Sequence, residues 1–182
     1  MKKVLIVSGS NSAPQTSINW KLANFIASNL RKHSAQVTGM FEHSLPMYQQ
    51  SLESDLPKHV VSFGELIREH DALIIVSPEH NGLMPSCLKN AIDWLSRTRN
   101  DGDASFFGAT KKPVMLFSTS PGENGGATNL KIMSELMPWW GGEVIGTHSI
   151  GNFQDKYQND MFESETEHSI MDHLNYFEQQ IG

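Results

Sequence analysis

Ala72-Leu73-Ile74-Ile75-Val76 runs directly into Ser77-Pro78-Glu79-His80-Asn81-Gly82-Leu83-Met84-Pro85, and this stretch decides the fold. The first five residues form an uninterrupted apolar run, β-branched in its second half, which is typical of a strand buried on both faces. Pro85 suits the first turn of a helix, because its missing N–H costs nothing there. Apolar residues then recur at helical spacing, at Leu88, Ala91, Ile92 and Leu95. The stretch predicts a polar loop at the carboxyl end of a buried strand, where open α/β sheets bind ligands.

Strand and helix patterns alternate along the rest of the chain. Strands are expected over Lys3–Ser8, Gln36–Phe41, Ala72–Val76, Pro113–Ser118 and Glu143–His148. Helices are expected over Ser17–Lys32, from Leu56 or Pro57 to just before Asp71, over Pro85–Arg97, from Gly125 to near Pro138, and over Ser164–Gln180. Five strands that alternate with helices predict an α/β fold with a parallel sheet and right-handed crossovers. Periodicity by itself does not order the strands.

Composition and charge narrow the class of protein. The 182 residues suit one domain, expected over 1–182. The formal net charge is −6 and no basic block occurs, so neither nucleic acid nor a membrane surface is an expected partner. The apolar run after Met1-Lys2-Lys3 stops after four residues without a cleavage site, so we expect a cytoplasmic protein. The single cysteine, Cys87, suits a reducing compartment. The eight histidines lack metal-ligand spacing, so no metal site is expected.

The loop after the first strand, from Gly9 to Asn19, carries small hydroxyl and amide residues ahead of a helix. Unpaired N–H groups and the helix dipole make such a helix start a phosphate site that needs no cationic side chain. The candidate phosphate-binding residues are Ser10, Asn11, Ser17 and Asn19. A simpler role for Ser17 is that of a helix N-cap, and composition does not separate the two.

Three segments together resemble the NAD(P)H-dependent FMN reductases, a flavodoxin-like family that includes quinone, azo-dye and chromate reductases. Residues 78–94 resemble Pro-Glu-Tyr-Asn-Gly-x-x-Pro-x-x-Leu-Lys-Asn-Ala-x-Asp-Trp. The segment departs from the family where His80 replaces Tyr, Leu83 replaces a frequent Ser and Ser86 replaces a Gly. Residues 118–126 resemble Ser-x-Ser-Pro-Gly-x-x-Gly-Gly. The first loop departs from Gly-Ser-x-Arg-x-x-Ser-x-Asn: it is two residues longer and has no arginine before Lys21.

The resemblance implies a three-layer sandwich with strand order 2-1-3-4-5 and a ligand crevice between the first and third strands. It implies FMN as cofactor, NADPH or NADH as co-substrate, and a flavin, quinone, azo compound or metal oxyanion as acceptor. Hydride would pass to flavin N5, and the acceptor would then take electrons in a ping-pong scheme; no catalytic side chain is needed, because the flavin carries the chemistry. A homodimer or homotetramer, with Trp94 near the contact, is also implied. The flavin-facing residues are expected to be Pro78, Glu79, His80, Asn81, Gly82, Ser118, Ser120 and Gly122.

Two other functions fit the same residues. One is a flavodoxin-like electron carrier that binds FMN without a nicotinamide substrate, and the other is a flavin-free interaction domain. Individual residues also have simpler roles: Glu79 as a charge that supports a helix, and His80 as a surface side chain. Reduction of bound FMN by NADPH without oxygen separates the three functions.

Overall fold

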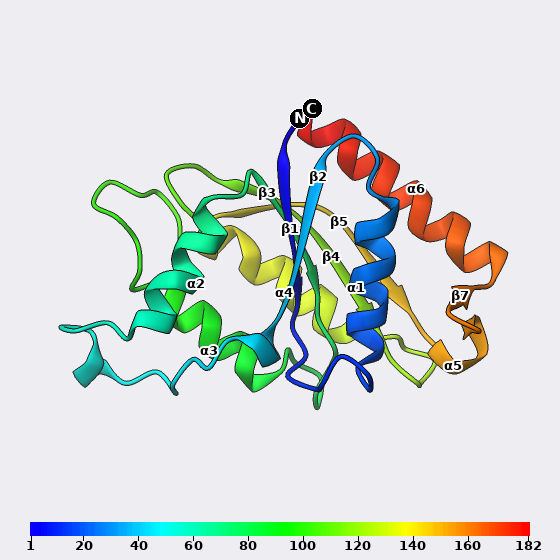
Figure 1. Ribbon diagram of the computed structural model, residues 1–182, viewed down its shortest axis with the longest axis horizontal. Coiled ribbons are helices and arrows are strands. Elements are labelled where there is room, and N and C mark those ends of the chain that lie inside the picture. The colour runs from blue at the N-terminus through cyan, green and yellow to red at the C-terminus, as the bar shows by residue number, and fades with distance from the viewer.

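The computed structural model describes residues 1–182 and contains a five-stranded parallel sheet in the order β2-β1-β3-β4-β5 (Figure 1). The strands are β1 (Lys3–Ser8), β2 (Ser34–Gly39), β3 (Ala72–Val76), β4 (Lys112–Thr119) and β5 (Gly142–Ile150). The longer helices are α1 (Ile18–Asn29), α2 (Lys58–Arg68), α3 (Ser86–Leu95), α4 (Ala127–Trp140) and α6 (Ser164–Ile181). The α/β class and the strand order expected from the resemblance are confirmed.

Alternate residues of each strand face two separate apolar cores. In β1, Leu5 and Val7 point into a core shared with α2, α3 and α4, whereas Val4 and Ile6 point into a core shared with α1 and α6. Because both faces are covered, β3 is apolar at every position, as its sequence predicted. Two helical layers therefore enclose the sheet and leave its edges for polar loops (Figure 1).

Some boundaries differ from the expected ones. β2 begins at Ser34 and ends at Gly39, because residues 40–42 form a 3₁₀ turn where strand had been expected. α4 continues through Pro138 to Trp140 and ends at Gly141, whose φ of +91° suits a helix C-terminus. The sequence patterns predicted no element between β5 and α6. The structure has the short helix α5 (Phe153–Lys156) there, followed by a hairpin of β6 (Tyr157–Gln158) and β7 (Met161–Phe162). None of the helices has the length and apolarity needed to cross a membrane.

Candidate active site

Three loops meet at one edge of the sheet, where β1, β3 and β4 end. In Figure 1 they lie along the lower edge, opposite the two termini. Between them is a cavity of about 210 Å³. It is lined by Ser10, Ser12, Thr16, Ser17, Ile18, Asn19, Pro78, Glu79, His80, Thr119, Ser120 and Pro121. The strand order creates this cavity, because the chain leaves β1 and β3 in opposite directions across the sheet.

The start of α1 presents hydrogen-bond donors to the cavity. Ser17 is the N-cap: its Oγ accepts the Trp20 N–H at 3.1 Å. The N–H groups of Ile18 and Asn19 take part in none of the loop or cap hydrogen bonds. Ser17 therefore caps the helix and lines the cavity at once, and two main-chain donors beside it remain free for an anion.

The side chain of Asn19 points across the cavity floor to the third loop. Its Nδ2 donates to the Thr119 carbonyl at 3.1 Å, and its Oδ1 accepts the Thr119 N–H at 3.3 Å. Asn19 is only 3% exposed. The carboxamide is thus used to hold two loops together, and the N–H of Asn19 is its remaining donor toward a ligand.

The second loop ends in a tight turn. His80 and Leu83 exchange two main-chain hydrogen bonds, of 2.8 and 3.2 Å, around Asn81 and Gly82. Both central residues have positive φ, +54° and +84°, which is the type I′ geometry that Asn-Gly favours. The N–H groups of Asn81 and Gly82 are used by none of these bonds and lie at the exposed tip.

Glu79 turns from the cavity wall to the start of α4. Its Oε2 accepts the Asn129 N–H at 3.0 Å and the Asn124 side-chain N–H at 3.4 Å. A carboxylate there is stabilised by the helix dipole and by otherwise unpaired N–H groups. The simpler role considered for Glu79, a charge that supports a helix, is therefore present in the structure.

The segment after β5 supports the third loop. The N–H of Phe153 donates to the Ser120 carbonyl at 3.1 Å, and the N–H of Asn152 donates to the Gly122 carbonyl at 3.0 Å. Thr119 Oγ1 donates to the Ile150 carbonyl at 2.8 Å. These bonds fix the loop main chain without using its exposed face.

The cavity contains no lysine or arginine, as the first loop's sequence indicated. The nearest cation in sequence, Lys21, instead places its Nζ 5.4 Å from the centre of the Tyr157 ring. Cys87 lies half-buried behind the first loop, with Sγ 3.4 Å from the Gly9 carbonyl oxygen. Burial raises the pKa of this thiol, which makes it a poor nucleophile.

The structure brings most of the residues selected from the sequence to the cavity, namely Ser10, Ser17, Asn19, Pro78, Glu79, His80 and Ser120. The others lie around it. Asn11 is exposed on the first loop, Asn81 and Gly82 form the turn tip, Gly122 is exposed, and Ser118 is fully buried beneath the third loop.

Sequence reasoning missed several lining residues: Ser12, Thr16, Ile18, Thr119 and Pro121. All of them lie within the loops that the sequence analysis had selected. Their position in those loops could have identified them, whereas their residue types did not. Trp94, expected near a subunit contact, is 1% exposed and donates its Nε1–H to the Pro46 carbonyl at 2.7 Å. Any contact surface on α3 must therefore come from other residues.

The model of the NADPH-dependent FMN reductase family matches residues 2–155. The chain belongs to this family. An NADH-dependent flavin reductase subunit 2 of Lactobacillus johnsonii is 30% identical over 92% of the chain and 91% of that protein. A 2-hydroxy-1,4-benzoquinone reductase of Burkholderia is 37% identical over 69% of the chain and 64% of that protein. Among solved structures, FerB of Paracoccus denitrificans, described as a flavoenzyme NAD(P)H:(acceptor) oxidoreductase, has a TM-score of 0.80 and 25% identity. That comparison covers 100% of this chain and 97% of FerB.

Family membership identifies the chain as an NAD(P)H-dependent oxidoreductase that uses FMN. The residues present fit that cofactor. A phosphate requires several hydrogen-bond donors, and the start of α1 offers free N–H groups beside the hydroxyls of Ser10, Ser12 and Thr16. A flavin ring requires close main-chain approach, and the glycine-containing turn at the second loop permits it.

Proposed function

We propose that the cavity holds the phosphate and ribityl chain of FMN, while the flavin ring lies outside it against the second and third loops. The support is the size and lining of the cavity. At about 210 Å³ it is smaller than the ~300–1,000 Å³ of sites that enclose a drug-sized ligand. Its hydroxyl and main-chain donors suit the polar half of FMN, whereas the ring requires the flatter surface of residues 78–82.

The residues selected from the sequence have distinct parts in this proposal. Ser10, Asn11, Ser17 and the N–H of Asn19 hold the phosphate. Residues 78–82 border the ring, with the free N–H groups of Asn81 and Gly82 directed at its polar edge, where negative charge accumulates on reduction. Ser120 and Gly122 shape the other wall, and Ser118, which is fully buried, supports that loop from beneath. No side chain is required to move a proton.

When bound, FMN supplies the redox chemistry: it accepts a hydride from NAD(P)H and later passes two electrons, with protons, to a small-molecule acceptor. A ring outside the cavity would be open on one face, and one open face would not hold both substrates at once. The chain is therefore proposed to release NAD(P)⁺ before the acceptor binds. Flavins and quinones are the proposed acceptors, by analogy with the names of its relatives.

The single observation that carries the proposal is the convergence of the three loops on one polar cavity with free N–H donors. The test is to purify the protein, reconstitute it with FMN, and add NADPH or NADH without oxygen while recording the visible spectrum. Bleaching within seconds, followed by recovery on addition of a quinone, supports the proposal. FMN-loaded protein that stays yellow would be an electron carrier. Protein that binds no FMN would be neither a reductase nor an electron carrier. Parallel lines in double-reciprocal plots are expected for NADH against acceptor.

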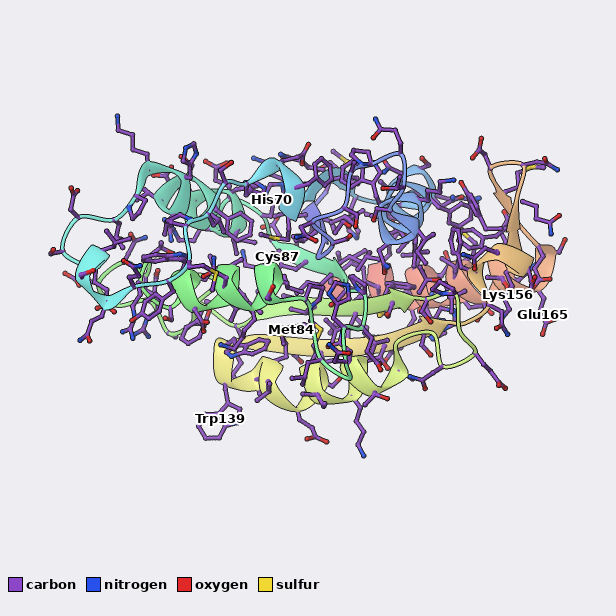
Figure 2. All side chains as sticks on the ribbon, turned by 90° about the horizontal axis from the view of Figure 1, so that it is seen from below. His70, Met84, Cys87, Trp139, Lys156 and Glu165 are labelled. Atoms are coloured by element: carbon purple, nitrogen blue, oxygen red, sulfur yellow. The ribbon has the colours of Figure 1, made fainter.

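We also propose that the protein is a homodimer or homotetramer in the cytoplasm. Trp139 is 83% exposed, and Leu136, one turn earlier on α4, is 36% exposed. Figure 2 shows Trp139 projecting outward from α4, away from the rest of the molecule. An exposed tryptophan beside a leucine is unusual on a monomer and typical of a contact surface. The lone Cys87 is consistent with a reducing compartment.

A further inference from the structure

Asn129 lies in the first turn of α4, is fully buried, and does not line the cavity. All of its donors nevertheless go to the second loop. Its Nδ2 donates to Ser77 Oγ at 3.0 Å and to the Pro78 carbonyl at 3.2 Å. Its N–H donates to Glu79 Oε2 at 3.0 Å. One residue outside the site therefore binds three consecutive residues of the loop that would border the flavin.

This arrangement follows from what α4 lacks. The residue at its N-cap is Gly126, which has no side chain with which to cap the helix. Glu79 supplies the missing acceptor from a different loop, 50 residues earlier in the chain. In return the helix fixes the position of Glu79, because leaving that carboxylate or the buried Asn129 amide unpaired would cost free energy.

The direction of the Asn129 side chain is also determined. Its Nδ2 has two acceptors, whereas its Oδ1 has no hydrogen-bond partner within the protein. The hydrogen bonds that Nδ2 donates therefore hold this side chain in place, and its oxygen contributes none. Loss of those donors therefore releases Ser77 and Pro78 without substituting any residue that lines the cavity.

We propose that Asn129 and Glu79 are positioning residues for the flavin: together they set the main chain of residues 77–80 and thereby the surface against which the ring lies. This inference rests on the proposed function. Asn129 acts only through the second loop. Its removal should weaken FMN binding and change the environment of the ring, which the visible spectrum and the midpoint potential of bound FMN report.

The experiment compares four variants with the wild type. Asn129→Leu removes both side-chain donors at similar volume. Glu79→Ala removes the acceptor at the helix start, and Glu79→Gln returns a neutral oxygen to it. Asn90→Leu is the matched control. Asn90 is another buried asparagine, on α3, whose Nδ2 donates to the Pro46 carbonyl at 2.9 Å and whose Oδ1 accepts the Tyr48 N–H at 2.8 Å. Asn129 and Asn90 do not line the cavity, whereas Glu79 does.

Four quantities are measured: the FMN dissociation constant by fluorescence quenching, the spectrum and midpoint potential of bound FMN, the Tm of the apoprotein, and its amide NMR shifts. Asn129→Leu should weaken FMN binding about tenfold, the equivalent of losing one or two buried hydrogen bonds. It should also alter the flavin spectrum and potential and move the amide signals of residues 77–83. Glu79→Ala should act in the same direction, and Glu79→Gln should recover part of its loss. Asn90→Leu should lower Tm by an amount similar to Asn129→Leu. It should leave the flavin spectrum unchanged and the FMN dissociation constant within about twofold of the wild-type value.

Wild-type FMN affinity, potential and spectrum in Asn129→Leu and Glu79→Ala would overturn the inference while leaving the proposed function standing. Equal losses of FMN affinity in Asn129→Leu and Asn90→Leu would also overturn it, because they would reflect stability alone. If Asn129→Leu does not fold, the two Glu79 variants decide the question. Equal FMN affinity and equal flavin spectra in Glu79→Ala and Glu79→Gln would contradict the inference. Wild-type protein that binds no FMN would overturn both proposals.

Discussion

Gly126 stands directly over the hydroxyl of Ser118. A Cβ at residue 126 would lie 1.9 Å from Ser118 Oγ and 2.9 Å from Ser118 Cβ. Its φ of +86° is in addition a backbone conformation that side chains disfavour. The start of α4 and the end of β4 therefore approach each other as closely as a glycine allows, and this brings the third loop to the cavity.

The contact between residues 126 and 118 predicts a specific coupling. Gly126→Ala should destabilise the protein by ~2–4 kcal/mol, through overlap with Ser118 and positive-φ strain. Ser118→Ala in the same chain should recover part of that loss, because it removes the nearer atom, while the strain remains. Chemical denaturation of the two single variants and the double variant measures the coupling. Additive effects would show that the two residues do not clash.

The carboxamide of Asn19 is predicted to be structural as well as close to the ligand. Asn19→Ala should cost ~2–3 kcal/mol of stability, because it removes two buried hydrogen bonds to the main chain of Thr119. FMN affinity should fall with it as the first and third loops separate. Asn24→Ala is the control: Asn24 is exposed on the same helix, and its change should stay within ~0.5 kcal/mol. Urea unfolding and FMN titration of both variants provide the comparison.

FMN binding is predicted to depend little on cationic side chains. Lys21→Ala should leave the FMN dissociation constant unchanged, because Lys21 lies over Tyr157 and does not line the cavity. The phosphate should still contribute, so riboflavin should bind at least about tenfold more weakly than FMN. Titrations of FMN and riboflavin into both proteins measure this. A large loss in Lys21→Ala would indicate that the lysine reaches the phosphate after all.

Acid should weaken the fold through His148. Burial, then the neighbouring His173 and Lys156, lower the pKa of His148 to about 4. The His148 and His173 rings stack with their centres 4.2 Å apart. Between about pH 6.5 and 4 the unfolded chain binds a proton at this site that the folded protein does not. Stability should therefore fall across that window, by ~1–3 kcal/mol given partial exposure, and level off below it.

The variants that isolate this effect are His148→Gln, which removes the titrating group, and His168→Gln, which removes an exposed histidine of α6. Denaturant midpoints at a series of pH values should show a smaller decline between pH 6.5 and 4 in His148→Gln. The decline in His168→Gln should match that of the wild type. The same pH profile in all three proteins would assign the acid sensitivity to other groups.

Oligomerisation is predicted to require Trp139. Trp139→Lys should shift the protein toward monomer in sedimentation velocity, because a charge there opposes burial of the α4 face. Met161→Lys is the control: Met161 is 65% exposed on β7, away from α4, and its change should leave assembly unaltered. Assembly that persists in Trp139→Lys would place the subunit contact elsewhere on the surface.

Much of the fold could be predicted from local sequence patterns. The strand β3 is buried on both faces, because each of its residues is apolar and would be unfavourably exposed to water on a solvent-facing side of the sheet. Asn81-Gly82 forms the I′ turn that this dipeptide favours, and Ser17 caps the helix that follows it. Each of these features depends on residues within one or two turns of each other, so the chain encodes them directly. The family motifs added the strand order, which periodicity does not contain.

The contacts that organise the site were not predictable in this way. Asn19 meets Thr119 across 100 residues, and Glu79 meets Asn129 across 50. Sequence reasoning assigned Asn19 to a ligand phosphate and Glu79 to the flavin, with a helix-supporting charge as the simpler role of Glu79. It could not name the partners, because polar residues in such loops have free side chains until their neighbours are known. Strand register and helix packing bring the partners together, since the loops meet only once the parallel sheet has formed. The sequence by itself determined which loops carry the chemistry; the tertiary structure decided which of their side chains hold the site together and which donors remain for a ligand.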